Sequence, residues 1–201
     1  MFLRFVKCIM YSSFVLFSAS VCWANDNIET EIGQFNIKDS AITETKFTSM
    51  FGKGCAVTKN IEGKIYEKKH IYYINDKKLW VELRFSHVLG NSMESTLETV
   101  LITKRKLDSK NCKPVKKIES LITPAKIQIG DSIENVIKAY GNPSITINVE
   151  RDNTYSVLSE YLKIKKGKIL RYLPNHNDES FFAEFYFDKR TLHSILISGE
   201  E

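Results

Sequence analysis

Two segments of the chain repeat one pattern of apolar and polar positions. Residues 127–143 read IQIGDSIENVIKAYGNP, and residues 35–54 read FNIKDSAITETKFTSMFGKG. Each begins with alternating apolar residues and an Asp-Ser pair, and continues into a helix-like run that ends in an aromatic residue and glycine. In the second segment four apolar side chains follow the i, i+3, i+4, i+7 spacing of one helix face: Ile133, Val136, Ile137 and Tyr140.

The ends of this helix are also encoded locally. Asp131 and Glu134 have the spacing of a capping box, with Asp131 as the predicted cap. Gly141 suits a left-handed C-terminal position, and Pro143 prevents continuation. In the first segment Asp39-Ser40 matches Asp131-Ser132, and Phe51-Gly52 matches Tyr140-Gly141 after three extra residues, close to one helical turn.

Strand-like runs separated by turn signals follow each helix. Those of the second half are expected at 155–164, 168–173, 180–187 and 191–198, and those of the first half at 64–75, 78–85 and 97–106. The predicted fold class is α+β, with two tandem units, each a helix followed by an antiparallel sheet. Duplication of one unit is the preferred explanation, and coincidence between two common helix starts is the alternative. The predicted organisation is a signal peptide at 1–24, an N-terminal segment at 25–34, units at 35–107 and 125–201, and a basic linker at 108–124.

The strands at 78–85 and 180–187 alternate, so each presents two distinct faces. One face is expected to be core beneath the helix: Leu79, Val81, Leu83 and Phe85, and Phe181, Ala183, Phe185 and Phe187. The other face mixes aromatic and charged side chains and supplies the predicted partner-binding residues: Trp80, Glu82, Arg84, Phe182, Glu184 and Tyr186. Protein interfaces favour such a mixture, because Trp, Tyr and Arg carry much of the binding energy. The alternative is that a loop or the other half covers these side chains as secondary core.

The beginning of the chain has the pattern of an export signal. Arg4 and Lys7 precede an apolar run at 9–17, and Ala24 fits the cleavage site. A periplasmic or secreted location is therefore predicted. A lipid anchor on Cys22 is less favoured, because Val21 stands where a small residue is expected.

Removal of the signal leaves Cys55 and Cys112 as the remaining cysteines. In an exported chain such a pair predicts one disulfide, which for a loop of this length would contribute about 4 kcal/mol. Two free, buried thiols are the alternative.

The charge of the mature chain is mild, with 27 basic against 24 acidic residues, which does not favour nucleic acid as a partner. The basic residues nevertheless gather in two runs, around residues 104–117 and 163–171. Edge strands often carry lysine as protection against aggregation. The functional alternatives are an acidic protein surface and anionic headgroups at a membrane face.

Sequence signatures of catalysis are missing from the chain. It has no Gly-x-Ser-x-Gly, His-Glu-x-x-His, Walker or dinucleotide-binding motif. His70, His87, His176 and His193 are not at metal-ligand spacing, and the stretch from Asn175 to Glu179 is interpreted as a polar hairpin loop rather than a cation site. No cofactor, no metal and no catalytic residue is predicted.

The segment IQIGDSIENVIKAYGNPS resembles a known family pattern. It is similar to the segment that opens the BamE/SmpA–OmlA lipoproteins and each repeat of the beta-lactamase inhibitor proteins (BLIP), with matches at Gly130, Asp131, Ser132, Val136, Gly141 and Pro143. The first copy departs from the pattern, with Lys38 in place of the glycine and Gly54 in place of the proline. The resemblance implies tandem helix-then-sheet units and an exported protein that acts by binding protein, and it transfers no active residues.

The predicted function is a non-catalytic, exported protein-binding module, in its specific form an inhibitor or immunity protein that docks an envelope enzyme or toxin through the aromatic sheet face. One alternative is an envelope-assembly accessory of the BamE type. The alternative of another class is an unrecognised envelope hydrolase.

Overall fold

A computed structural model describes most of the chain. The described residues are 31–32, 35–37, 43–52, 54–61, 65–74, 76–88, 95–107, 121–152, 154–173 and 181–199. The predicted signal peptide and its Cys22, most of the linker with Cys112, Asp39-Ser40, and the loop at 175–179 lie outside these residues.

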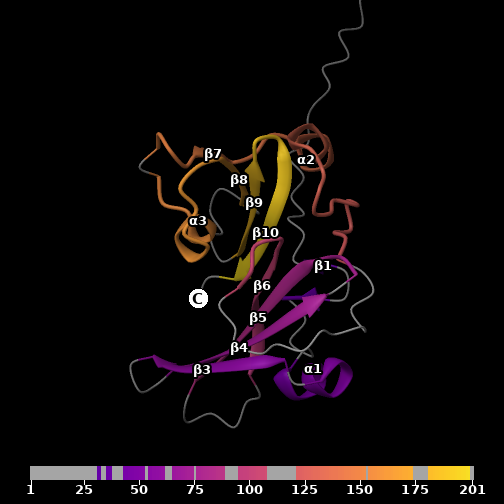
Figure 1. The fold of residues 1–201 in the computed structure, drawn as a ribbon. Coiled ribbons are helices and arrows are strands. Elements are labelled where there is room, and N and C mark those ends of the chain that lie inside the picture. Colours follow the sequence, from indigo (N-terminus) through magenta and orange to yellow (C-terminus); the bar gives the residue numbers. More distant parts are fainter. Residues whose placement is uncertain are drawn as a thin grey trace, which may run out of the picture.

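The centre of the fold is a single antiparallel sheet of eight strands in the order β3-β4-β5-β6-β10-β9-β8-β7 (Figure 1). The first half supplies β3 (Cys55–Ile61), β4 (Ile65–Ile74), β5 (Leu79–Val88) and β6 (Thr96–Thr103). The second half supplies β7 (Ile145–Asn148), β8 (Lys168–Tyr172), β9 (Phe181–Asp188) and β10 (Thr191–Gly199). A small separate sheet pairs β1 (Glu31–Ile32) with β2 (Phe35–Asn36). The α+β class is confirmed.

The order of the strands is the same from each edge towards the middle, where the last strands of the two halves pair. Leu101 of β6 lies opposite Leu196 of β10, and Ile102 and Val100 lie opposite Ile195 and Ile197. The hydroxyl oxygens of Thr103 and Ser194 are 2.7 Å apart, and those of Thr99 and Ser198 are 2.9 Å apart. A two-fold rotation about the Leu101–Leu196 pair therefore exchanges the two hydroxyl pairs.

Helices α1 (Glu44–Phe51) and α2 (Ile133–Tyr140) each contain eight residues and end alike. The caps are Thr43 and Ser132, whose hydroxyls accept hydrogen bonds from the backbone N–H groups of Lys46 and Asn135. The glycines that follow, Gly52 and Gly141, have φ of 80° and 79°, which costs glycine little.

The expected cap at Asp131 was wrong, because its carboxylate instead accepts from the backbone N–H of Gln128, 2.8 Å away. Thr43, rather than Ser40, occupies the position of Ser132. The three extra residues of the first copy therefore lie before α1 and not within it, and the two helices keep the same length.

A tyrosine from the sheet fixes the end of each helix in the same way. The hydroxyl of Tyr72 on β4 donates to the carbonyl of Gly52 at 3.0 Å, and that of Tyr172 on β8 donates to the carbonyl of Gly141 at 3.1 Å. Burial raises the pKa of both phenols to about 12, so both remain donors at neutral pH.

Removal of either hydroxyl is expected to cost a similar amount of stability. Tyr72→Phe and Tyr172→Phe should each lower the free energy of unfolding by about 1 kcal/mol, the usual net value of one such hydrogen bond. Urea unfolding would measure both, with Tyr155→Phe, at a 62 % exposed side chain, as the control. A loss confined to one of the two tyrosines would contradict their equivalence.

The main core lies between the sheet and the two long helices and extends across both halves. It includes the apolar strand faces predicted from the alternation, with Leu79, Val81, Leu83, Phe85, Ala183, Phe185 and Phe187 buried and Phe181 partly buried. From the helices it includes Phe47, Val136 and Tyr140. Leu121 and Thr123, assigned to the linker by sequence, also pack here, and Thr123 accepts a hydrogen bond from Tyr140.

One predicted strand was wrong, and two strands were not predicted. The strand expected at 155–164 is instead the short helix α3 (Val157–Tyr161), capped by Ser156, followed by a turn. The strands β3 and β7 were not predicted: β7 is short, and the sequence of β3, CAVTKNI, lacks strict alternation. The remaining predicted strands are present with shifted ends.

Candidate functional site: the outer sheet face

We call the face of the sheet that points away from α1 and α2 the outer face; Figure 1 shows α3 on this side. The strand register places one residue from each strand in a single row across it. The row is Cys55, Ile71, Glu82, Leu101, Leu196, Glu184, Arg171 and Ile145. Two carboxylates therefore flank the central leucine pair symmetrically, each one strand away from it.

The six predicted partner-binding residues all lie on this face, at equivalent positions of β5 and β9, but most are not exposed. Glu82, Phe182, Glu184 and Tyr186 retain 1, 3, 0 and 5 % of their accessible surface. Trp80 and Arg84 are half-buried. The prediction of an exposed aromatic platform was therefore wrong for four of the six residues.

Helix α3 and the turn after it are the reason. Leu158 and Ile164 are buried against Phe182, Tyr186 and Leu196 in a second core cluster. Residues 155–164 were predicted to be another strand of the sheet, so their position on top of its outer face was not anticipated.

The carboxylate of Glu184 holds the beginning of α3 in place. It accepts hydrogen bonds from the Ser156 hydroxyl at 3.0 Å and from the backbone N–H of Leu158 at 2.7 Å. The guanidinium of Arg171 contributes two further bonds, from Nε at 2.8 Å and Nη2 at 2.5 Å. The buried charge is thus both paired and hydrogen-bonded, as a buried carboxylate requires.

The end of α3 is attached to the first half of the chain through Glu82. The Tyr161 hydroxyl donates to one carboxylate oxygen of Glu82, and Arg84 Nε donates to the other at 2.8 Å. The Arg84 guanidinium also lies over the Tyr161 ring, 4.1 Å from its centre, and Lys69 lies over it at 4.9 Å. Burial and the neighbouring Glu82 carboxylate raise the pKa of Tyr161, which keeps it a hydrogen-bond donor. Helix α3 therefore connects the two buried carboxylates.

Beyond α3 the outer face opens into a groove of about 620 Å³. We call it the outer-face groove; its lining is Ile71, Glu82, Arg105, Lys106, Leu107, Tyr161, Leu162 and Lys163. Ile71 and Leu107 are buried and supply apolar surface, whereas Lys106 and Lys163 are exposed. The groove therefore combines an apolar floor with a basic rim.

An aromatic pair continues the open surface along the same face. Tyr73 and Trp80 are paired across β4 and β5, two positions along the strands from the groove residues Ile71 and Glu82. Their ring centres are 4.8 Å apart, and both side chains are half-buried. Trp80 is thus the predicted site residue whose ring is still partly accessible.

The structure describes the side chains of two histidines, His70 and His193, and both lie among residues of the sheet. His70 is buried, with Nε2 2.9 Å from a Glu44 carboxylate oxygen that also lies 2.7 Å from Lys68 Nζ. Burial alone would raise the pKa of Glu44, but the bonds from Lys68 and His70 outweigh it and hold the pKa below its usual value. His193 is half-exposed on β10, where burial and nearby Lys104 lower its pKa.

The described part of the chain contains no group of three His, Cys, Asp or Glu side chains arranged to hold a metal ion. Within the same residues, no helix is long and apolar enough to cross a membrane. The arrangement on the outer face is instead suited to binding, because its polar groups are charged side chains around an apolar floor.

No protein-family model, curated protein or solved structure matches this chain. The resemblance of residues 127–143 to the inhibitor proteins and the envelope lipoproteins therefore stays a prediction from those residues.

Proposed function

We propose that the chain is a non-catalytic, exported protein-binding module that docks a partner through Trp80, Tyr73 and the outer-face groove. The observation that carries the proposal is the half-buried Tyr73–Trp80 pair beside a 620 Å³ groove with a basic rim. Tryptophan, tyrosine and arginine are the residues that most often dominate the binding energy of protein interfaces. An inhibitor or immunity protein that blocks an enzyme is the specific form we favour.

The proposed architecture behind this function is a duplicated helix-and-sheet unit of the BLIP/BamE-like type. The two halves have the same strand order from the edge of the sheet to its centre, where a two-fold rotation exchanges the two hydroxyl pairs. In both halves a tyrosine, Tyr72 or Tyr172, donates a hydrogen bond to the glycine that ends the helix. These features support the proposed duplication. Two units that share one sheet present a broader outer face than one unit does.

Export is part of the proposal, together with a disulfide bond at Cys55. Cys55 is the single cysteine among the described residues, so its partner is not identified there. We propose Cys112, the other cysteine of the mature chain. A disulfide suits an oxidising compartment and, with the signal-like start, a periplasmic or secreted location.

Substitution of Trp80 tests the docking surface. The mature chain, residues 25–201, would be used to capture its partner from an envelope extract, and the affinity for the identified partner would then be measured by calorimetry. Trp80→Ala is expected to raise Kd about 30-fold, equivalent to about 2 kcal/mol, because it removes an interface anchor.

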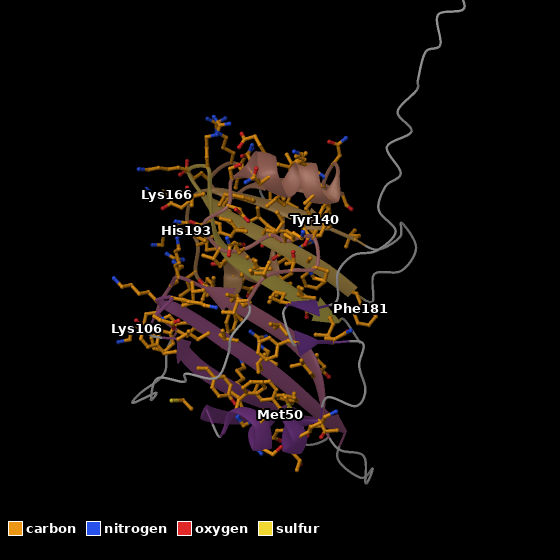
Figure 2. All side chains as sticks on the ribbon, turned by 90° about the vertical axis from the view of Figure 1, so that its right-hand side faces the viewer. Met50, Lys106, Tyr140, Lys166, Phe181 and His193 are labelled. Carbon is orange, nitrogen blue, oxygen red and sulfur yellow. The ribbon has the colours of Figure 1, made fainter. Side chains whose placement is uncertain are left out.

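The matched control is Met50→Ala. Met50 is a large apolar residue, 51 % exposed, on α1 and so on the opposite side of the sheet from the groove (Figure 2). The Met50→Ala substitution should leave the Kd for the partner unchanged. Circular dichroism would verify that both variants are folded. If the two substitutions have the same effect on Kd, the outer face is not the docking surface.

A further inference from the structure

The rim of the outer-face groove concentrates positive charge from two separate segments. Arg105 and Lys106 lie in the segment that follows β6, and Lys163 lies in the turn after α3. The one carboxylate in the lining, Glu82, is 1 % exposed and already bonded to Arg84 and Tyr161. The accessible charge at the rim is therefore cationic.

The guanidinium of Arg105 is hydrogen-bonded to the segment that carries Lys163. Arg105 Nη1 donates to the carbonyl of Leu162 at 2.8 Å, and the backbone N–H of Arg105 donates to the Thr103 hydroxyl at 3.0 Å. Lys163 has φ of 50°, the left-handed conformation that reverses the chain after α3. A guanidinium carries five N–H donors, so this contact leaves Arg105 able to bind a carboxylate through the others.

These cations have no acidic partner within the described part of the chain. None of the ion pairs found there involves Arg105, Lys106 or Lys163. The chain that continues from Leu107, residues 108–120, carries four lysines against Asp108 and Glu119. Its charge does not complement the rim, so charge complementarity favours an acidic occupant other than this segment.

The apolar floor of the groove indicates that the occupant also has an apolar side chain. Ile71, Leu107 and Leu162 provide apolar surface beside the cations, and the 620 Å³ of space is in the range of ordinary ligand cavities. An apolar side chain on this floor would bring an adjacent carboxylate next to Arg105 and Lys163. Both groups occur together in a protein segment that places Asp or Glu beside a large apolar residue.

We infer that the outer-face groove recognises an acidic peptide segment of the partner protein, with an apolar side chain on the floor and a neighbouring carboxylate bound by Arg105, Lys106 and Lys163. The inference rests on the proposed docking function and adds the chemistry of the partner. It also assigns the specificity-determining residues, which are separate from the Trp80 anchor.

A displayed library of random 12-residue peptides, selected on the oxidised mature chain, provides the test. The expected binders carry Asp or Glu next to a large apolar residue. A synthetic peptide of the most enriched sequence should bind at least tenfold more weakly to the triple variant Arg105→Gln, Lys106→Gln, Lys163→Gln. The same loss is expected when the peptide's carboxylates are replaced by amides.

The matched control is Lys165→Gln, Lys166→Gln, Lys168→Gln, which removes the same charge from the neighbouring segment that leads into β8. Figure 2 shows Lys106, His193 and Lys166 following one another along the same edge of the molecule. The control should bind the peptide as the unchanged chain does. Equal losses in the two triple variants would mean that overall charge alone attracts the peptide, which overturns the inference.

The outcomes separate the inference from the proposed function. If peptides are selected that lack acidic residues and depend on Trp80, the docking face stands and its preference for acidic segments fails. If acidic peptides depend on the rim while Trp80→Ala changes neither their affinity nor that of the partner, the rim assignment stands and the proposed anchor fails. A selection without any groove-dependent binder overturns the inference.

Discussion

Replacement of Arg171 by methionine is expected to lower the free energy of unfolding by about 3–5 kcal/mol, because it leaves the Glu184 carboxylate buried without its cation. Glu184 is fully buried, and Arg171 supplies two of its four hydrogen bonds. Methionine retains much of the length of the arginine stem, so the loss reports mainly on the charge. Urea unfolding followed by circular dichroism would measure it.

Two further variants identify the cause. The double variant Arg171→Met, Glu184→Gln should recover most of the loss, because the amide keeps an acceptor for the backbone of Leu158 and carries no charge. Arg190→Met, which disrupts the exposed Arg190–Glu134 pair in the same half, should leave stability unchanged within experimental error. A double variant no more stable than Arg171→Met would refute the buried-charge explanation.

The second large effect is expected in the core beneath α1. Phe47→Ala should lower the free energy of unfolding by about 3–5 kcal/mol, the usual cost of removing a buried phenyl ring. The Phe47 ring lies at the centre of an aromatic cluster, with ring-centre distances of 5.5 Å to Phe35, 4.6 Å to Phe51, 5.7 Å to Tyr72 and 5.9 Å to Phe85. Its removal therefore leaves a cavity among large, rigid side chains, which cannot easily close around it.

The position of Phe47 in α1 is occupied in α2 by Val136, which is also buried and provides the matched comparison. Val136→Ala removes only two methyl groups and should cost about 2 kcal/mol. Thermal or urea unfolding of both variants would show whether α1 depends on this ring. A smaller loss for Phe47→Ala than for Val136→Ala would contradict the aromatic packing.

The two halves of the sheet have the same strand order but differ in what lies on the outer face. In the second half, α3 seals Phe182, Glu184 and Tyr186. In the first half the equivalent strand carries Trp80, Glu82 and Arg84, and the groove beside it is open. The proposed docking surface is thus asymmetric: the second half supplies a cover and one wall of the groove, and the first half supplies most of the floor and rim.

Local sequence predicted the elements whose signals are complete within a few residues. The helix at 133–140 was predicted because the spacing of its apolar side chains, Gly141 and Pro143 all agree, and the core faces of β5 and β9 were predicted because strict alternation assigns side chains to faces. The errors fell on two short segments and on β3, whose sequence lacks strict alternation. β7 has four residues and α3 has five, too few for either period to be distinguished.

The sequence by itself determined the α+β class, the repeated helix with its glycine end, and which strand residues share a face, because these depend on side chains a few positions apart. The tertiary structure alone decided what covers each face. The bond from Leu158 to Glu184 joins residues 26 positions apart, and the bond from Tyr161 to Glu82 joins residues 79 positions apart. Alternation records that a side chain points to one side of a sheet, but burial depends on which distant segment lies there, and that is set by the packing of the whole chain.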